Sequence, residues 1–150
     1  MPLTPFRVQS LDHVELFVPD RHEAAAWYSR VLGLEILPEH EDWAEDPEGP
    51  LMISCDGGRT MLALFTGEPQ GSRGTAGFHR VAFRVDGPTF LAFRDRLDEV
   101  EVLDPDGRRV LPEHVRDHAK AFSIYFCDLW GHRLEVTTYD YALVAERLTS

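Results

Sequence analysis

The chain has 150 residues, 43% of them hydrophobic, which suffices for one compact domain or two half-domains that share an interface. Its 26 acidic and 15 basic residues give a formal net charge of -11, which disfavours nucleic acid and anionic membrane surfaces as partners. No apolar run approaches the roughly 20 residues of a membrane span, and residues 1–5 do not resemble a secretory signal, so we expect a cytoplasmic protein.

The first half of the chain opens with an alternating apolar and polar run over residues 11–18, which predicts a strand. Pro19 and Asp20 are turn and helix-start signals, and a helix is expected over residues 21–31 with Gly33 as its left-handed end. The acidic stretch of residues 40–50 is expected to be a solvated loop, in which Trp43 is a candidate cover for a pocket. A hairpin is expected over residues 55–64.

The second half repeats this order after residues 66–77, which are rich in Gly and Pro and are expected to form a linker. A strand is predicted over residues 78–85, and a helix over residues 89–98 after the helix-start signal at residues 86–88. A second hairpin is predicted within residues 123–139, followed by a short helix.

The two halves therefore follow one plan, and each is predicted to be one βαβββ unit. The two opening strands are offset by 67 residues, and the two hairpins align without a gap at an offset of 72. This repeat predicts an α+β fold with two paired βαβββ modules in a single domain. The expected boundaries are about 10–65 for module one, 66–77 for the linker, 78–140 for module two and 141–149 for a C-terminal helix.

The closing segment carries an imidazole, a phenol and a carboxylate, those of His118, Tyr125 and Glu135. A hairpin with alternating apolar and polar residues can present such polar side chains into a cavity. The sequence therefore predicts a site for a small-molecule ligand or substrate.

The repeat and this closing segment resemble the vicinal oxygen chelate superfamily, the group of glyoxalases, bleomycin-resistance proteins and type I extradiol dioxygenases. The resemblance spans about residues 11–139, nearly the whole chain. It implies that the two modules pair around a U-shaped cleft. Because members often associate in pairs, it also implies a homodimer.

In the metal-using members, each module supplies ligands from its first and its last strand. The resemblance puts the first-strand places at His13 and Arg80, and the last-strand places at Ala63 and Glu135. It thus implies a divalent metal (Fe, Mn, Ni or Zn) held by His13 and Glu135. This ligand set is incomplete, because catalytic metal sites typically use about three protein ligands.

The missing ligand leaves several interpretations open. His79 replaces the histidine only if a β-bulge shifts the register by one residue. Arg80 either faces the cleft, where its guanidinium binds an anionic ligand group, or pairs with Glu135 and removes the metal site, or is an ordinary surface arginine. Trp130, in the hairpin turn, either lines the mouth of the cleft and contacts substrate or packs against the other module.

His118 and Tyr125 are the candidate catalytic residues. In extradiol dioxygenases, a histidine in a similar segment and a tyrosine ten residues before the glutamate ligand serve as acid/base and hydrogen-bonding groups. Tyr125 precedes Glu135 by ten residues, whereas His118 lies two residues closer to the tyrosine than in the dioxygenases. An imidazole exchanges protons near neutral pH, and a phenol stabilises a developing oxyanion.

Three functions follow from these residues. The first is an enzyme of glyoxalase or dioxygenase type, acting on a small oxygenated substrate that is chelated by the metal. The second is a metal-free protein that sequesters an aromatic or cationic compound, as bleomycin-resistance relatives do; the incomplete ligand set and the net charge of -11 favour it. The third is a structural or regulatory domain, whose cleft would be filled by side chains such as Trp43 and Trp130.

Overall fold

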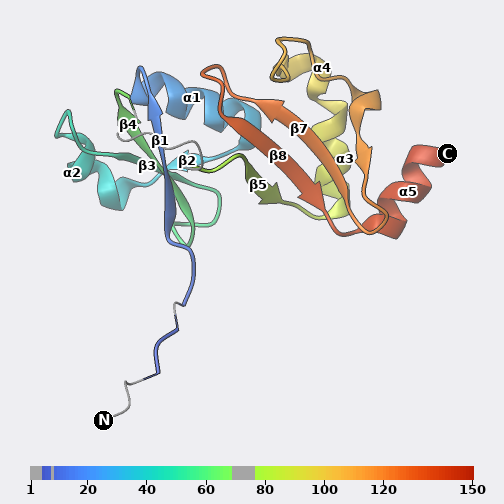
Figure 1. The fold of residues 1–150 in the computed structure, drawn as a ribbon, viewed down its shortest axis with the longest axis horizontal. Coiled ribbons are helices and arrows are strands. Elements are labelled where there is room, and N and C mark those ends of the chain that lie inside the picture. Colours follow the sequence, from blue (N-terminus) through green and yellow to red (C-terminus); the bar gives the residue numbers. More distant parts are fainter. Residues whose placement is uncertain (1–4, 8, 69–76) are drawn as a thin grey trace. The chain divides into compact units, whose positions relative to one another are not determined.

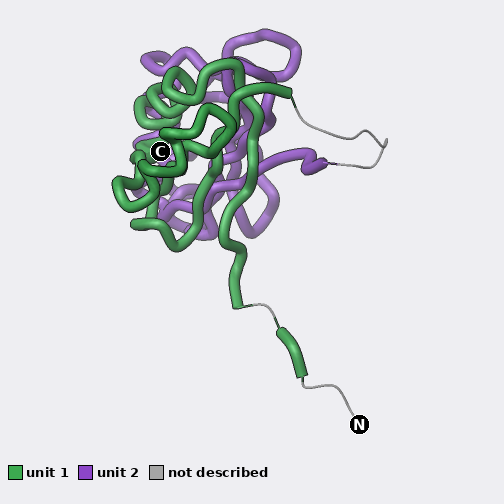
Figure 2. Tube along the Cα trace, turned by 90° about the vertical axis from the view of Figure 1, so that its left-hand side faces the viewer, with its two compact units in different colours: residues 1–72 green, residues 73–150 purple. Residues whose placement is uncertain are grey.

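The computed structural model describes residues 5–7, 9–68 and 77–150 (Figure 1). The chain divides into two compact units, Met1–Ser72 and Arg73–Ser150 (Figure 2), and each is described by itself. None of the helices in the described ranges is both long and apolar enough to cross a membrane.

The first unit is a four-stranded sheet with one long helix. Its strand order is β1-β4-β3-β2, with β1 parallel to β4 and the other neighbours antiparallel. The elements in chain order are β1 (His13–Val18), α1 (Arg21–Leu32), β2 (Glu35–Ile36), a 3-10 turn (Pro38–His40), α2 (Glu41–Ala44), β3 (Leu51–Ser54) and β4 (Met61–Thr66).

The second unit repeats this topology. Its strand order is β5-β8-β7-β6, again with the first and last strands of the unit parallel and the other neighbours antiparallel. The elements are β5 (Val81–Arg84), α3 (Gly87–Asp95), α4 (Leu97–Val100), a 3-10 turn (Pro112–His114), β6 (Arg116–Asp117), β7 (Phe122–Cys127), β8 (Arg133–Thr138) and α5 (Tyr141–Thr149). The predicted α+β class with two βαβββ modules is confirmed.

The helices begin and end where local chemistry allows. The side chain of Asp20 accepts hydrogen bonds from the amides of His22 and Glu23, which caps the first turn of α1. Gly33 ends α1 with a φ of 72°, a left-handed conformation that glycine adopts without strain. Asp86 caps α3 in the same way, by accepting from the amide of Thr89 at 2.9 Å.

Each sheet buries one face under its helix. In the first unit, Tyr28 and Val31 of α1 are fully buried together with Leu64 of β4. In the second, Phe90 of α3 and Leu134 of β8 are buried to the same degree. Each such side chain contributes roughly 1.5–3 kcal/mol by leaving water. Residues that alternate with these buried ones, such as Tyr125, Glu135 and Thr137, are therefore left to the opposite face of the second sheet.

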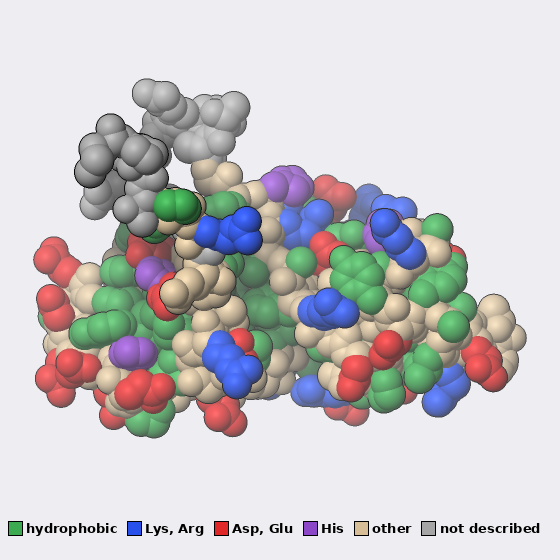
Figure 3. All heavy atoms as spheres, turned by 90° about the horizontal axis from the view of Figure 1, so that it is seen from below, with side chains coloured by type: hydrophobic (Ala, Val, Ile, Leu, Met, Phe, Trp, Pro, Cys, Tyr) green, Lys and Arg blue, Asp and Glu red, His purple; other side chains and the backbone are tan. Residues whose placement is uncertain are grey.

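The acid excess is carried on the surface. Many acidic side chains are visible on the face of the molecule that Figure 3 shows. The run expected from the sequence, residues 40–50, lies in the first unit and contains the helical turn α2. The prediction of a loop there is wrong for Glu41–Ala44, which form α2, whereas residues 45–50 lie outside helices and strands.

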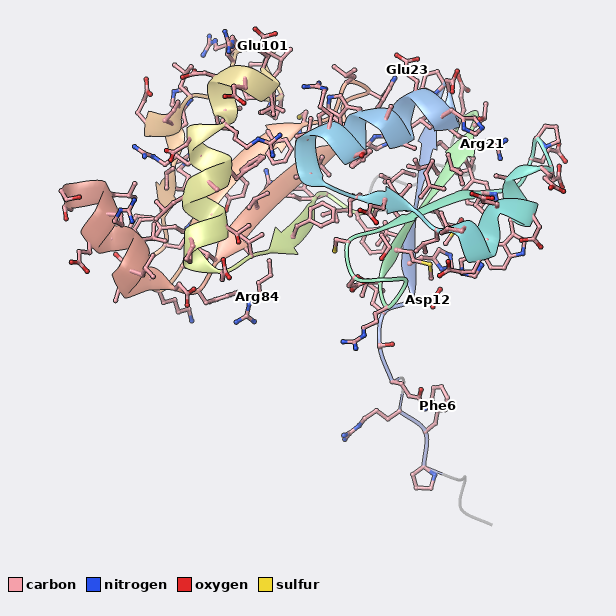
Figure 4. All side chains as sticks on the ribbon, turned by 180° about the vertical axis from the view of Figure 1, so that it is seen from behind. Phe6, Asp12, Arg21, Glu23, Arg84 and Glu101 are labelled. Atoms are coloured by element: carbon pink, nitrogen blue, oxygen red, sulfur yellow. The ribbon has the colours of Figure 1, made fainter. Side chains whose placement is uncertain are left out.

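A buried arginine explains that helical turn. The guanidinium of Arg21, at the start of α1 (Figure 4), donates to the carbonyl oxygens of Ala44 at 3.0 Å and Asp46 at 3.2 Å. A side chain 25 residues earlier therefore fixes the segment, a long-range contact that no local pattern shows. Trp43 is 46% exposed and stacks on the ring of His40, with 4.2 Å between centroids.

Four predicted boundaries are corrected. The strands expected over residues 11–18 and 78–85 begin at His13 and Val81, because their ladders with β4 and β8 begin there. The helix expected over residues 89–98 starts two residues earlier and is interrupted at Arg96, whose amide is shared between two carbonyl oxygens of α3. Thr66 belongs to β4 rather than to the linker, and residues 69–76 lie outside the described residues.

Candidate functional site

Strand register brings the predicted site residues of the second unit to one face of its sheet. Tyr125 of β7 pairs with Glu135 of β8, and Glu135 pairs with Ala82 of β5. Residues paired across strands lie on the same face. Arg80 lies two residues before Ala82, directly before β5, and so falls on this face as well, against Tyr125.

The first unit has the same register, which makes the corresponding positions explicit. Ala63 of β4 pairs with Glu15 of β1, and His13 lies two residues before Glu15. The structural counterpart of His13 is therefore Arg80, and that of Glu135 is Ala63. These are the pairs given by the sequence offsets of 67 and 72 residues.

His118 and Tyr125 are hydrogen-bonded to each other. Nε2 of His118 lies 2.8 Å from Oη of Tyr125, and the two rings meet edge to face with centroids 6.0 Å apart. His118 follows β6 in a tight turn in which Ala119 has a φ of 69° and donates its amide to Asp117 Oδ1 at 2.8 Å. The structure thus brings together the two candidate catalytic residues.

Arg80 lies against the same tyrosine. Its Cζ atom is 4.5 Å from the centroid of the Tyr125 ring, a cation–π contact. Its Nε is buried and has no hydrogen-bond partner. In the described part of the chain, Arg80 forms no ion pair with Glu135; Oε2 of that half-buried carboxylate instead accepts a hydrogen bond from Ser123 Oγ at 2.8 Å.

A cavity of about 770 Å³ adjoins these side chains within the second unit. Its polar lining includes Arg80, Asp104, Glu113, Arg116, His118 and Tyr125. Small-molecule sites typically have volumes of roughly 300–1,000 Å³, so the cavity has the size for such a ligand. Trp130 is not part of its wall: it is half-buried in the turn between β7 and β8, where its amide donates to Asp128.

His13 has a different environment in the first unit. Its Nδ1 lies 2.8 Å from Asp12 Oδ2, and its Nε2 lies 3.1 Å from Glu15 Oε2. The hydrogen bond with Asp12, with a smaller contribution from Glu15, raises the pKa of His13 against the opposing effect of burial. These carboxylates favour the protonated imidazole, a form that cannot bind a metal ion.

The residues at the four family positions do not fit a divalent metal ion. Ala63 has no donor atom, and Arg80 is a cation in a place where the family has a ligand. Within residues 5–7, 9–68 and 77–150, no three His, Cys, Asp or Glu side chains come together as a metal site. His79 does not fill the gap, because it is exposed and its Nδ1 lies 3.3 Å from Arg133 Nη1.

Two contributors to this site were missed from the sequence. Ser123 holds the carboxylate of Glu135, and the same alternation that places Tyr125 on this face places Ser123 there. Tyr141 of α5 donates its hydroxyl to Asp117, 2.9 Å from each carboxylate oxygen, and so anchors the residue before His118. No local signal indicated the second contact.

The fold and the site thus define a protein of two βαβββ units, the second of which has a cavity of about 770 Å³. Residues 10–136 match the family model of the Glyoxalase/Bleomycin resistance protein/Dioxygenase superfamily. The chain belongs to this superfamily, as the resemblance implied.

Several relatives are similar over most of their length. The metallothiol transferase FosB of Lysinibacillus sphaericus (strain C3-41) is 28% identical over 131 residues, 87% of this chain and 83% of FosB. The structure of the oxidase ChaP-H2 is 26% identical with a TM-score of 0.62, covering 90% of this chain and 97% of that one. The fosfomycin resistance protein FosX of Listeria monocytogenes, hexagonal form, shares the fold at 16% identity and a TM-score of 0.63, covering 92% of this chain and 99% of that one.

Proposed function

We propose that this protein is an enzyme that binds a small oxygenated molecule in the cavity of its second unit and moves a proton on it through His118 and Tyr125. The observation that carries the proposal is the 2.8 Å hydrogen bond between His118 Nε2 and Tyr125 Oη in the wall of the cavity. In this arrangement the phenol of Tyr125 passes its proton to Nε2 of His118 and takes a proton from the substrate. The renewed phenol hydroxyl then donates a hydrogen bond to the oxyanion that forms.

The relatives support a small-molecule enzyme without naming its substrate. FosB is named a metallothiol transferase and ChaP-H2 an oxidase, which are different reactions on a related scaffold. The substrate class must therefore be argued from the residues of this chain.

The test is a search for proton exchange. Wild type would be incubated in deuterated buffer with a panel of 2-hydroxy acids, 2-keto acids and ortho-dihydroxy aromatics, and NMR would follow deuterium uptake and substrate loss. We expect Tyr125→Phe and His118→Ala to lower the rate about 10²- to 10⁴-fold. His22→Ala, a change at an exposed histidine on α1, is the control and keeps the wild-type rate. Wild-type rates in both site variants would refute the proposal.

A metal-dependent enzyme is the second candidate, and Glu135 favours it. This half-buried carboxylate occupies a ligand place of the family and accepts a hydrogen bond from the neutral Ser123 hydroxyl. The resemblance gives His13 and Glu135 as the ligands and Fe, Mn, Ni or Zn as the metal. Because the other two family positions do not fit a metal ion, its remaining ligands would have to be water or substrate. Elemental analysis of wild type, His13→Ala and Glu135→Ala tests it: about one metal ion per chain, lost in both variants, supports it, and a metal-free wild type after incubation with these ions eliminates it.

Two outcomes lead to other functions. If ligands bind under a chelator but none is turned over, the chain is a metal-free binding protein, and its net charge of -11 favours cationic compounds. Association into a homodimer, which the resemblance implies, stays a prediction that sedimentation equilibrium tests. The cytoplasmic location likewise stays a prediction from the sequence.

A further inference from the structure

The geometry points to Arg80 as the replacement for the family's metal ion, so that the cavity of the second unit binds a small monoanionic carboxylate with a second oxygen beside the carboxylate group. This inference rests on the proposed function and specifies its substrate class. It starts from the disagreement between the family's metal and the residues that occupy its ligand places.

The first step is position. Arg80 is the structural counterpart of His13 and lies on the same sheet face as Glu135 and Tyr125. A guanidinium remains charged at every physiological pH, so its positive charge repels a divalent cation from this face. The same positive charge, held in a fixed place, stabilises an anionic oxygen electrostatically, as a metal ion would.

The second step is the unsatisfied donor. Nε of Arg80 is buried without a hydrogen-bond partner, and the ion pairs of the described residues do not include Arg80. Arg94 also has an unpartnered Nε, but its Nη1 lies 3.5 Å from Asp95 and it is outside the cavity wall. A planar carboxylate matches the fork of donors on a guanidinium, and its binding would supply the ion pair that Arg80 lacks among the described residues.

The third step is the neighbouring polar pair. Tyr125 lies beneath the guanidinium, with 4.5 Å between Arg80 Cζ and the ring centroid, and its hydroxyl is bonded to His118. A carboxylate on Arg80 would therefore place an adjacent hydroxyl or carbonyl oxygen near the group that moves the proton. A 2-hydroxy carboxylate or an ortho-hydroxy aromatic carboxylate has both oxygens in this relation.

The fourth step is charge. The cavity wall has two arginines, Arg80 and Arg116, and two acids, Asp104 and Glu113. Oδ1 of Asp104 accepts the amides of Asp106 and Arg108, so this acid is held in its own turn. The wall also has His114 and His118, and the chain as a whole has a net charge of -11. A second negative charge on the ligand would therefore be repelled, so the wall favours a monoanion paired with Arg80 over a phosphate dianion.

The experiment is calorimetric titration of the protein in buffer with a chelator, using three probes that share a benzene ring with one carboxyl or carboxamide group. They are 2-hydroxybenzoate, its uncharged amide, and benzoate, which lacks the second oxygen. We expect wild type to bind 2-hydroxybenzoate about 10- to 100-fold more tightly than the amide, the range for a hydrogen bond to a charged group. Benzoate should bind with intermediate affinity. Equal affinity for acid and amide, or tighter binding of inorganic phosphate, would overturn the inference.

Variants assign the discrimination to one side chain. Arg80→Gln should abolish the preference for the acid over the amide, and Arg80→Lys should keep part of it because the charge remains without the fork. Arg84→Gln is the matched control: this arginine (Figure 4) lies in β5, four residues after Arg80, and its Cζ lies 4.8 Å from the ring centroid of Tyr139. It is not part of the cavity wall. Circular dichroism and melting curves establish that each variant is folded. An unchanged preference in folded Arg80→Gln contradicts the inference.

A reverse substitution tests the replacement of the metal. Arg80→His returns an imidazole to the family's ligand place, and we expect it to bind Mn²⁺ or Ni²⁺ at least about 10-fold more tightly than wild type while losing the preference for 2-hydroxybenzoate. Equal metal affinity in both proteins would overturn the replacement. If turnover depends on His118 and Tyr125 but affinity does not depend on Arg80, this inference fails and the proposed function stands. If affinity depends on Arg80 but no turnover depends on His118 and Tyr125, the proposed function fails and the carboxylate-binding site stands.

Discussion

Tyr125 is in the site because its two neighbours are in the core. Ile124 and Phe126 are fully buried on the face that α3 covers, and strand alternation turns Tyr125 to the opposite face. There it meets His118 from the turn after β6 and Arg80 from the residue before β5. A one-residue change of register would place all three groups differently, so the packing of β7 determines the chemistry.

The same packing predicts the effect of a core substitution. Leu134 of β8 is completely buried, so Leu134→Ala should lower the free energy of unfolding by about 2–5 kcal/mol. Leu129→Ala, at a position 63% exposed in the turn between β7 and β8, should change it by less than about 0.5 kcal/mol. Urea denaturation measures both. Similar losses in the two variants would contradict the assignment of the core face.

At the scale of elements, the two hairpins repeat one polar clamp. Asp56 Oδ1 accepts the amide of Thr60 at 3.0 Å, and Asp128 Oδ1 accepts the amide of His132 at 2.9 Å. The two aspartates are 72 residues apart, and so are their partners Thr60 and His132, which is the offset that aligns the two hairpins. The repeat thus extends from strand order to the side chains that close the turns.

The Asp56 clamp gives a prediction about pH. Hydrogen bonds from the amide and hydroxyl of Thr60 and from Ser54 lower the pKa of Asp56 to about 2. Because the pKa in the folded state lies below that in the unfolded state, the clamp stabilises the fold at pH values above the ordinary aspartate pKa of 3.8. This contribution is lost as the pH falls through about 2. Asp56→Asn should therefore melt at a lower temperature than wild type at pH 7, with a difference that shrinks between pH 4 and pH 2. A constant difference across this range would contradict the role of the carboxylate.

The helix α5 positions the turn that carries His118. Tyr141 donates to Asp117, which raises the pKa of Tyr141, and its ring stacks on Phe122 with 4.7 Å between centroids. The amide of Gly87 donates to Asp140 Oδ2 at 2.6 Å, which fixes the start of α5 against the start of α3.

A substitution at Gly87 should disturb that junction. A Cβ atom at this position would lie 2.9 Å from Asp140 Cβ and 2.9 Å from Leu143 Cδ2, closer than side-chain atoms tolerate. We expect Gly87→Ala to lower the free energy of unfolding by about 1–3 kcal/mol. Adding Leu143→Ala should recover part of the loss, because it removes one of the two contacts. Denaturation of the single and double variants measures this, and a neutral Gly87→Ala would show that α5 is not held there.

At the scale of the whole molecule, each unit has its own buried core, formed by a sheet and its helix. A ligand stabilises a fold only if it binds the folded state. Because the family positions do not fit a metal ion, we expect a chelator to leave the melting temperature within about 1 °C of its untreated value. Differential scanning calorimetry with and without the chelator tests this. A fall of several degrees would show that a bound metal ion contributes to stability and would favour the second candidate function.

The sequence by itself determined the α+β class, the two βαβββ units, the helix starts at Asp20 and Asp86 and the corresponding places His13, Arg80, Ala63 and Glu135. These features depend on periodicity and capping, which act over a few residues. Only the tertiary structure decided that Arg21 fixes the segment after α2, that Arg80 stacks on Tyr125 with an unsatisfied Nε, and that His118 is bonded to Tyr125. Such contacts join residues from different elements, and their geometry follows from how the packed sheet brings those elements together.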